Sequence, residues 1–169
     1  MNVIVTGAIG SGKTTAVTRA IRALQPRRVA GIRTRAIVRR GRKVALVLGA
    51  WEGEGERVFA RASEGAESVG DFEVDLTVFN TFGLSVLRRA ADAPLVVLDE
   101  LGVLEQRATA YTEAAKALWR RQGNIIAVIQ ARALQFWLAC LGPESPHALF
   151  DLNASDRDEL PSSISARIA

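Results

Sequence analysis

Short continuous apolar runs alternate along this chain with stretches in which apolar residues recur every three or four positions. The apolar runs predict buried strands, and the periodic stretches predict amphipathic helices. Strands are expected at residues 3–5, 95–98, 125–129 and 148–152, and helices from residue 13 and over 77–91, 111–121, 133–141 and 160–168. This alternation is typical of an α/β fold, in which a mostly parallel central sheet is covered by helices on both faces.

The segment after the first predicted helix departs from this alternation. Residues 29–38 and 44–48 are both rich in β-forming residues, and the link between them, Arg39-Arg40-Gly41-Arg42, is short and contains glycine. This arrangement predicts a small antiparallel hairpin in addition to the parallel sheet. Residues 51–70 are rich in Gly, Glu and Ala, so we expect a loop with about one helical turn there, followed by a short strand at 72–74.

A glycine-rich segment lies between the first predicted strand and the first predicted helix, and it has the spacing Gly-x-x-x-x-Gly-Lys-Thr of the phosphate-binding loop, or Walker A motif. Glycines let the backbone curl so that successive N–H groups point at an anion, and the helix that follows adds its positive N-terminal end. The lysine can reach the β- and γ-phosphates, and the threonine hydroxyl can ligate Mg²⁺. The motif predicts a P-loop NTPase in which the nucleotide is bound by Gly7, Ala8, Ile9, Gly10, Ser11, Gly12, Lys13, Thr14 and Thr15.

An acidic pair, Asp99-Glu100, follows the buried strand at 95–98 and matches the Walker B pattern that accompanies such a loop. We expect Asp99 to hold Mg²⁺ opposite Thr14, so that these two residues form the metal site. Glu100 is expected to orient and partly deprotonate the attacking water, which makes Lys13 and Glu100 the predicted catalytic residues. The alternative is an acidic pair that only opens a loop or caps a helix.

Five segments of the chain together resemble the thermostable, or cancer-related, nucleoside-triphosphatase family. They are Gly7-Ala8-Ile9-Gly10-Ser11-Gly12-Lys13-Thr14-Thr15, Gly31-Ile32-Arg33-Thr34 with Arg40-Gly41-Arg42, Val69-Gly70-Asp71-Phe72-Glu73-Val74, Asp99-Glu100-Leu101-Gly102-Val103-Leu104-Glu105 and Asp156-Arg157-Asp158. The fourth segment is the most specific, because Gly102 and Glu105 extend it beyond a generic acidic pair. The chain departs from the family pattern at Ile32 and Arg33, at Leu104 and at Asp156, and none of these positions belongs to the predicted phosphate chemistry.

The resemblance implies Mg²⁺-dependent hydrolysis of ATP, GTP and other nucleoside triphosphates to the diphosphate and phosphate. It also implies that residues 98–105 lie against the nucleotide, which adds Leu98, Leu101 and Gly102 to the predicted contacts. Arg157 is a further predicted contact, because it lies in the loop after the last predicted strand, where P-loop folds often hold the base.

Composition and charge restrict the partners and the location. The formal net charge is +4, and the basic residues are concentrated between Arg27 and Lys43, a span without acidic residues. Such a patch can steer an anionic ligand, but few aromatic residues accompany it, so nucleic acid is not an expected partner. No apolar run approaches the ~18 residues of a membrane span. Cys140 is the single cysteine, and no signal peptide is evident, so we expect one cytoplasmic domain over residues 1–169.

Two other functions use the same motifs. A nucleotide or nucleoside kinase would transfer the phosphoryl group to an acceptor, although the short apolar segment 133–145 does not look like an arginine-rich kinase lid. A slow nucleotide-driven switch would use the basic segment 27–43 as a docking face. A hydrolase also gains from an arginine near the transferred phosphate, and the candidates for this role are Arg33, Arg35, Arg107, Arg132 and Arg157. Gln130, at a strand end, either senses the γ-phosphate or the water or is an ordinary polar strand-end residue.

Overall fold

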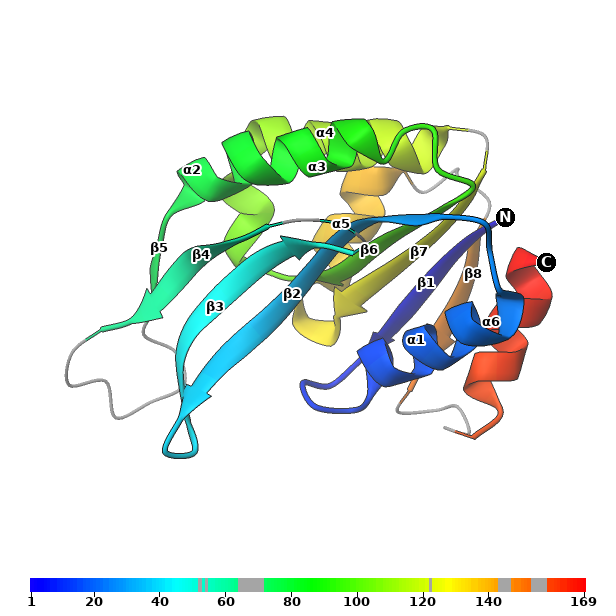
Figure 1. Cartoon of the computed structure of the whole chain (residues 1–169), viewed down its shortest axis with the longest axis horizontal. Helices are drawn as coiled ribbons and strands as arrows, with labels where there is room; N and C mark the ends of the chain where they lie inside the picture. Colours follow the sequence, from blue (N-terminus) through cyan, green and yellow to red (C-terminus); the bar gives the residue numbers. More distant parts are fainter. Residues whose placement is uncertain (52, 54, 64–71, 122, 143–146, 153–157) are drawn as a thin grey trace.

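A single sheet runs through the computed structural model, which describes residues 1–51, 53, 55–63, 72–121, 123–142, 147–152 and 158–169. Its strands lie in the order β5-β4-β3-β2-β6-β7-β1-β8 (Figure 1). Their bounds are β1 Asn2–Gly7, β2 Val29–Arg39, β3 Arg42–Ala50, β4 Glu56–Ala62, β5 Phe72–Val74, β6 Leu95–Leu101, β7 Asn124–Gln130 and β8 His147–Asp151.

The strands from β2 to β8 in this order pair in parallel, and β3, β4 and β5 extend the sheet in antiparallel pairings. The predicted mostly parallel sheet is therefore confirmed, and so is the predicted hairpin, which is formed by β2 and β3. The hairpin does not stand beside the sheet, because β2 also pairs with β6 and so belongs to both parts.

Helices cover both faces of the sheet, as predicted. Figure 1 shows α1 and α6 on one face and α3, α4 and α5 on the other. The helical elements are α1 Lys13–Leu24, α2 Leu76–Val78, the π-helical η1 Phe79–Gly83, α3 Leu84–Arg89, the 3-10 turn η2 Leu104–Arg107, α4 Thr109–Arg120, the 3-10 turn η3 Ala131–Ala133, α5 Leu134–Leu141 and α6 Leu160–Ile168. In the described part of the chain, no helix is long and apolar enough to span a bilayer.

The central strands are buried on both faces, so packing on both sides holds them in place. In β1, the side chains of Val3 and Val5 pack in the cluster with α1 and α6, whereas Ile4 packs in the cluster with α3, α4 and α5. All three are fully buried, and burial of each such side chain contributes roughly 1.5–3 kcal/mol. The segment that follows β1 therefore starts from a rigid support.

The loop expected over residues 51–70 was wrong for the part that forms β4, and residues 64–70 lie outside the described part of the chain. The register with β3 passes from Leu46–Ala60 to Val47–Val58, so Phe59 is an extra residue in a β-bulge. Phe59 and Ala60 are consequently both buried, although they are neighbours. This breaks the apolar–polar alternation by which a half-buried strand is normally found in a sequence.

Candidate nucleotide site

The glycine-rich loop connects β1 to α1 at the carboxyl edge of the parallel strands. Gly10 and Gly12 adopt φ values of +77° and +96°, which side chains with a Cβ rarely tolerate. The backbone N–H of Ser11 donates to the carbonyl oxygen of Ala8 at 3.2 Å and closes the turn. The Ser11 hydroxyl is buried without a hydrogen-bond partner in the described structure. Because buried polar atoms are nearly always paired, this hydroxyl suits a polar ligand in the loop.

Lys13 lies over this loop, with only 6% of its surface exposed. Its Nζ donates to the carbonyl oxygens of Gly7 and Ala8 at 3.0 and 2.7 Å. Burial lowers the pKa of the Lys13 ammonium, while the carboxylates of Glu100 and Asp99 act in the opposite direction. A buried ammonium in a glycine-rich loop at the N-terminal end of a helix is suited to an anionic ligand such as a phosphate.

Thr14 and Asp99 come from α1 and β6 and meet at the start of the helix. The Thr14 hydroxyl donates to both carboxylate oxygens of Asp99, at 3.0 and 3.2 Å. Asp99 has no exposed surface, and burial raises the pKa of its carboxyl to about 7, although the Thr14 hydrogen bond opposes the rise. A buried carboxylate of this kind is stabilised by a nearby cation.

The oxygen donors of Thr14 and Asp99 fit Mg²⁺ in their chemistry. Hydroxyl and carboxylate oxygens are ligands that Mg²⁺ accepts, and the ion usually takes one or two protein ligands together with water and phosphate oxygens. No group of three or more His, Cys, Asp and Glu side chains suited to a metal occurs among the described residues. A cation bound here would therefore share its ligands with a bound phosphate rather than occupy an all-protein cage.

Glu100 lies next to Asp99 but in a different environment, and the backbone explains the difference. The pairing of β6 with β7 passes from Leu98–Ala127 to Leu101–Ile129, so Asp99 and Glu100 together face one residue of β7. Glu100 adopts φ +67° in this bulge, a left-handed conformation that costs a residue other than glycine about 1–3 kcal/mol. The bulge leaves Asp99 buried and Glu100 half-exposed at the sheet edge.

Gln130 ends β7, the strand that lies between β1 and β6. Its Nε2 donates to Glu100 Oε1 at 3.4 Å, and its Oε1 accepts from Arg132 Nε at 3.1 Å. Sequence reasoning left open whether Gln130 is a functional residue or an ordinary strand-end residue. The structure places it against Glu100, between the phosphate loop and the acidic pair.

The segment after β6 supports this arrangement through contacts that the sequence did not predict. The Gly102 N–H donates to the buried Glu105 carboxylate, and Trp137 Nε1 donates to the Gly102 carbonyl oxygen at 2.8 Å. Burial raises the pKa of Glu105 to about 7. A Cβ at position 102 would lie 2.8 Å from Cδ of Gln130, so a glycine is needed for the amide to approach. The sequence did contain one signal, a glutamate three residues after a glycine.

The structure brings Lys13, Thr14, Asp99 and Glu100 together, as their predicted roles require. Leu98 and Leu101, which were also predicted to contact the nucleotide, have fully buried side chains in the core, so only their backbones are available for such a contact. Arg157 and Asp156 lie outside the described residues.

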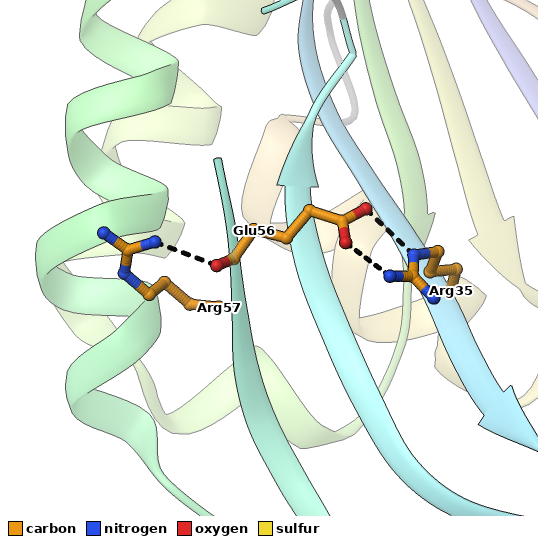
Figure 2. A network of polar contacts seen from close by, with 3 residues as sticks. All are labelled: Arg35, Glu56 and Arg57. Carbon is orange, nitrogen blue, oxygen red and sulfur yellow. Dashed lines mark hydrogen bonds and ion pairs between the residues drawn. The ribbon is translucent and has the colours of Figure 1, made fainter. Parts of the chain in front are cut away.

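The structure also separates the candidate arginines. Figure 2 shows Arg35 in a two-pronged contact with the Glu56 carboxylate, to which its Nε donates at 2.9 Å. Its guanidinium is therefore engaged on the hairpin surface. The positive charge of Arg33, by contrast, opposes the burial that raises the pKa of Asp99, so Arg33 acts electrostatically on that carboxyl group. Arg132 donates to the Gln130 amide, which in turn donates to Glu100.

Comparisons with known proteins agree with this geometry. The family model described as NTPase matches residues 2–165. The nucleoside-triphosphatase THEP1 of Methanosarcina barkeri is 28% identical over 170 residues, covering 99% of this chain and 97% of the relative. The protein of the same name from Archaeoglobus fulgidus is 32% identical over 123 residues, or 72% and 73% of the two chains.

Two solved structures share the fold. The crystal structure of THEP1 from Aquifex aeolicus superimposes with a TM-score of 0.79 at 23% identity and covers 99% of both chains. The solution structure of a human cancer-related nucleoside triphosphatase gives a TM-score of 0.75 at 24% identity, covering 98% of this chain and 96% of that one. The resemblance predicted from the sequence is thereby confirmed: the chain has a P-loop NTPase fold and belongs to the NTPase family, the family of the THEP1-type nucleoside-triphosphatases.

Proposed function

We propose that this protein is a Mg²⁺-dependent phosphohydrolase that converts nucleoside triphosphates and water to nucleoside diphosphates and phosphate, with broad base specificity. One observation carries the proposal: a buried Asp99 is bonded to the Thr14 hydroxyl, and Glu100 stands beside it on a strained bulge, in contact with Gln130. The curated relatives are called nucleoside-triphosphatases, which supports hydrolysis of the same substrate class.

Lys13 and the glycine-rich loop would bind the β- and γ-phosphates. Phosphate oxygens would replace the carbonyl oxygens of Gly7 and Ala8 as acceptors for Lys13 Nζ. The buried Ser11 hydroxyl and the loop N–H groups supply further donors, and the N-terminal end of α1 adds a favourable dipole. These groups stabilise the charge that develops on the phosphate oxygens as the terminal bond breaks.

Thr14 and Asp99 would hold Mg²⁺ together with phosphate oxygens. When bound, the ion supplies positive charge that neutralises the triphosphate and its leaving group. The burial of Asp99 matters for this role, because a carboxylate without solvent depends on a neighbouring cation for its charge.

Glu100 would orient the attacking water and accept its proton. The water oxygen forms a bond to the γ-phosphorus while the bond to the bridging oxygen breaks, and the electron pair leaves with the diphosphate. Gln130 is in a position to keep the Glu100 carboxylate in the required orientation, because its amide contacts Oε1. General bases of this kind contribute roughly 10²–10⁴-fold to the rate.

Broad base specificity is supported by the nature of the side chains that meet in the described part of the site. The proposed ligands of these side chains are phosphate, metal and water, and not the base; the side chains are Lys13, Thr14, Asp99 and Glu100. The phosphates are the same in every nucleoside triphosphate. The cytoplasmic location stays a prediction from the sequence.

The experiment is phosphate release from ATP, GTP, CTP and UTP, each measured with Mg²⁺ and after its removal by EDTA, with Lys13→Ala as the blank. We expect multiple turnover of all four substrates, loss of release with EDTA and no release by the variant. Release from a single nucleotide would refute broad specificity. Release that survives EDTA would refute the metal requirement, and tight binding without turnover would favour a switch.

A further inference from the structure

A pocket of about 250 Å³ opens beside Glu100. Its walls come from parts of the chain that are distant in sequence: the tip of the glycine-rich loop, the β2–β3 hairpin, β4, β5 and the segment after β6. Figure 1 shows how β3, β4 and β5 extend the sheet beyond β2, on the side away from β1. The antiparallel extension thus supplies one wall of a pocket whose other wall belongs to the nucleotide site.

The pocket and the nucleotide site have some residues in common, and these lie on one side of the nucleotide site. Ile9, Glu100 and Gln130 line the pocket, whereas Lys13, Thr14 and Asp99 do not. A molecule in the pocket would therefore approach the terminal phosphate past Glu100, the proposed base, and not past the residues that would hold the metal and the phosphates. An attacking nucleophile is expected on this side, because Glu100 is the proposed base.

The size of the pocket exceeds what hydrolysis requires. A water molecule takes up about 30 Å³ in the liquid, so the pocket is several times larger than one attacking water. Small-molecule sites are usually about 300–1,000 Å³, so this pocket is slightly smaller than the lower limit of that range.

The walls combine apolar and cationic groups with the carboxyl side chains of Glu100 and Glu105 at the end next to the nucleotide site. Leu46, Phe59 and Phe72 form an apolar surface suited to a planar ring, while Lys43 and Arg132 provide positive charge. In the part of the chain that the structure describes, neither cation makes an ion pair with a carboxylate. Arg35 also lines the pocket, but its guanidinium is already paired with the Glu56 carboxylate, as Figure 2 shows. The pocket therefore suits a molecule with an apolar ring and an anionic group.

We propose that this pocket binds a nucleoside monophosphate as a phosphoryl acceptor, so that the enzyme has a transferase activity alongside hydrolysis. The ring would pack on Phe72 and Leu46, the monophosphate would bind Lys43 and Arg132, and a ribose hydroxyl would face Glu100. The hydroxyl oxygen forms a bond to the γ-phosphorus, the bond to the bridging oxygen breaks, and the electron pair leaves on the nucleoside diphosphate. The hydroxyl proton passes to the Glu100 carboxylate. This proposal rests on the proposed function, because both reactions use the same bound triphosphate.

The test uses the full chain with Mg²⁺, ATP labelled with ¹⁸O in its γ-phosphate and AMP, GMP, CMP or UMP as the acceptor. The matching nucleosides serve as acceptors that lack the anionic group. Mass spectrometry measures the labelled phosphorylated acceptor, and phosphate release is measured in parallel without an acceptor. We expect at least one monophosphate to gain the label on a ribose hydroxyl, and the matching nucleoside to gain roughly tenfold less, since a charge-assisted hydrogen bond contributes about 1.5–3 kcal/mol.

A matched pair of variants tests whether the pocket is responsible. Lys43→Glu should lower kcat/KM for the acceptor about tenfold or more and leave acceptor-free phosphate release unchanged. Arg42→Glu makes the same charge change on the neighbouring exposed residue, which does not line the pocket, and should leave both rates unchanged.

The outcomes separate this inference from the proposed hydrolysis. Phosphate release without any labelled acceptor would overturn the acceptor site and leave the hydrolase intact. Equal losses of acceptor labelling in Lys43→Glu and Arg42→Glu would overturn the assignment to the pocket. A labelled acceptor without acceptor-free phosphate release would support the transferase and refute the hydrolase.

Discussion

The substitution Gly102→Ala should displace the Gln130 amide that contacts Glu100, the proposed base, while Glu100 itself stays unchanged. A methyl group at this position would lie 2.8 Å from Cδ and Nε2 of Gln130 and 2.9 Å from its Oε1. Contacts between a Cβ and other heavy atoms normally exceed about 3.4 Å, so the Gln130 amide must move by about 0.6 Å or more. The Gln130–Glu100 contact, already 3.4 Å long, would then be lost in Gly102→Ala.

The expected loss is in catalysis rather than in folding. The amide is the end of a flexible side chain and can move aside, and the backbone at Gly102 is not in the left-handed region, so the free energy of unfolding should fall by less than about 1 kcal/mol. Misplacement of a catalytic group by about 1 Å can cost up to 10²-fold in rate. We therefore expect kcat for phosphate release to fall by roughly 10- to 100-fold in Gly102→Ala.

The assay is a double-mutant cycle of Gly102→Ala and Gln130→Ala. Steady-state phosphate release gives kcat, a fluorescent triphosphate analogue gives Kd, and thermal unfolding gives Tm. If Gly102→Ala acts only by displacing the amide, the double variant should lose no more activity than Gln130→Ala alone. The affinity for the triphosphate should be unchanged in all three variants, because the hydrogen bonds that the Gln130 amide makes in the described part of the chain run to Glu100 and Arg132 and not to Lys13 or Thr14.

Wild-type turnover by Gly102→Ala would refute the role of Gln130 in positioning Glu100. Additive losses in the double variant would also refute it, since they would show that the methyl group acts by another route. A large fall in Tm would show that position 102 is needed for folding and not for the placement of the amide.

Three further predictions concern the scaffold. Burial raises the pKa of Glu105 to about 7, so the folded protein binds its proton more tightly than the unfolded chain; the resulting stabilisation is complete below about pH 4.5 and is lost as the pH rises through 7. Glu105→Gln should flatten the fall in urea midpoint between pH 5 and 8, and an unchanged slope would contradict this. Gly31→Ala would place a Cβ 2.0 Å from the Val97 carbonyl oxygen, and the residue would have to keep a φ of +124°. We therefore expect the free energy of unfolding in urea to fall by about 3 kcal/mol or more. A fall of less than about 1 kcal/mol would contradict the close packing of β2 on β6. Trp137→Phe removes the donor to the Gly102 carbonyl and should cost about 1–3 kcal/mol, which an unchanged Tm would exclude.

The phosphate loop could be predicted from the sequence because its information is local. Gly10, Gly12, Lys13 and Thr14 lie within one turn and the start of one helix, so their spacing alone defines the geometry. The acidic pair was predictable for a related reason, since a buried apolar run ends directly before it. The predicted parallel sheet likewise follows from apolar runs that are confirmed as β1, β6 and β7.

The features that the sequence did not reveal depend on pairings between distant segments. The bulge that separates the environments of Asp99 and Glu100 exists only in the register between β6 and β7. The position of Gln130 beside Glu100 follows from a strand order that could not be derived from the sequence. The strand β4 was missed because the bulge at Phe59 hides its alternation.

Phosphate release from MgATP by Glu100→Gln, measured together with Kd for the triphosphate, tests the central claim most directly. The substitution keeps the size of the side chain and removes its ability to accept a proton. We predict that kcat falls by roughly 10²–10⁴-fold while Kd stays within about twofold of the wild-type value. Release at the wild-type rate would contradict the assignment of Glu100 as the base, and with it the proposed mechanism of hydrolysis.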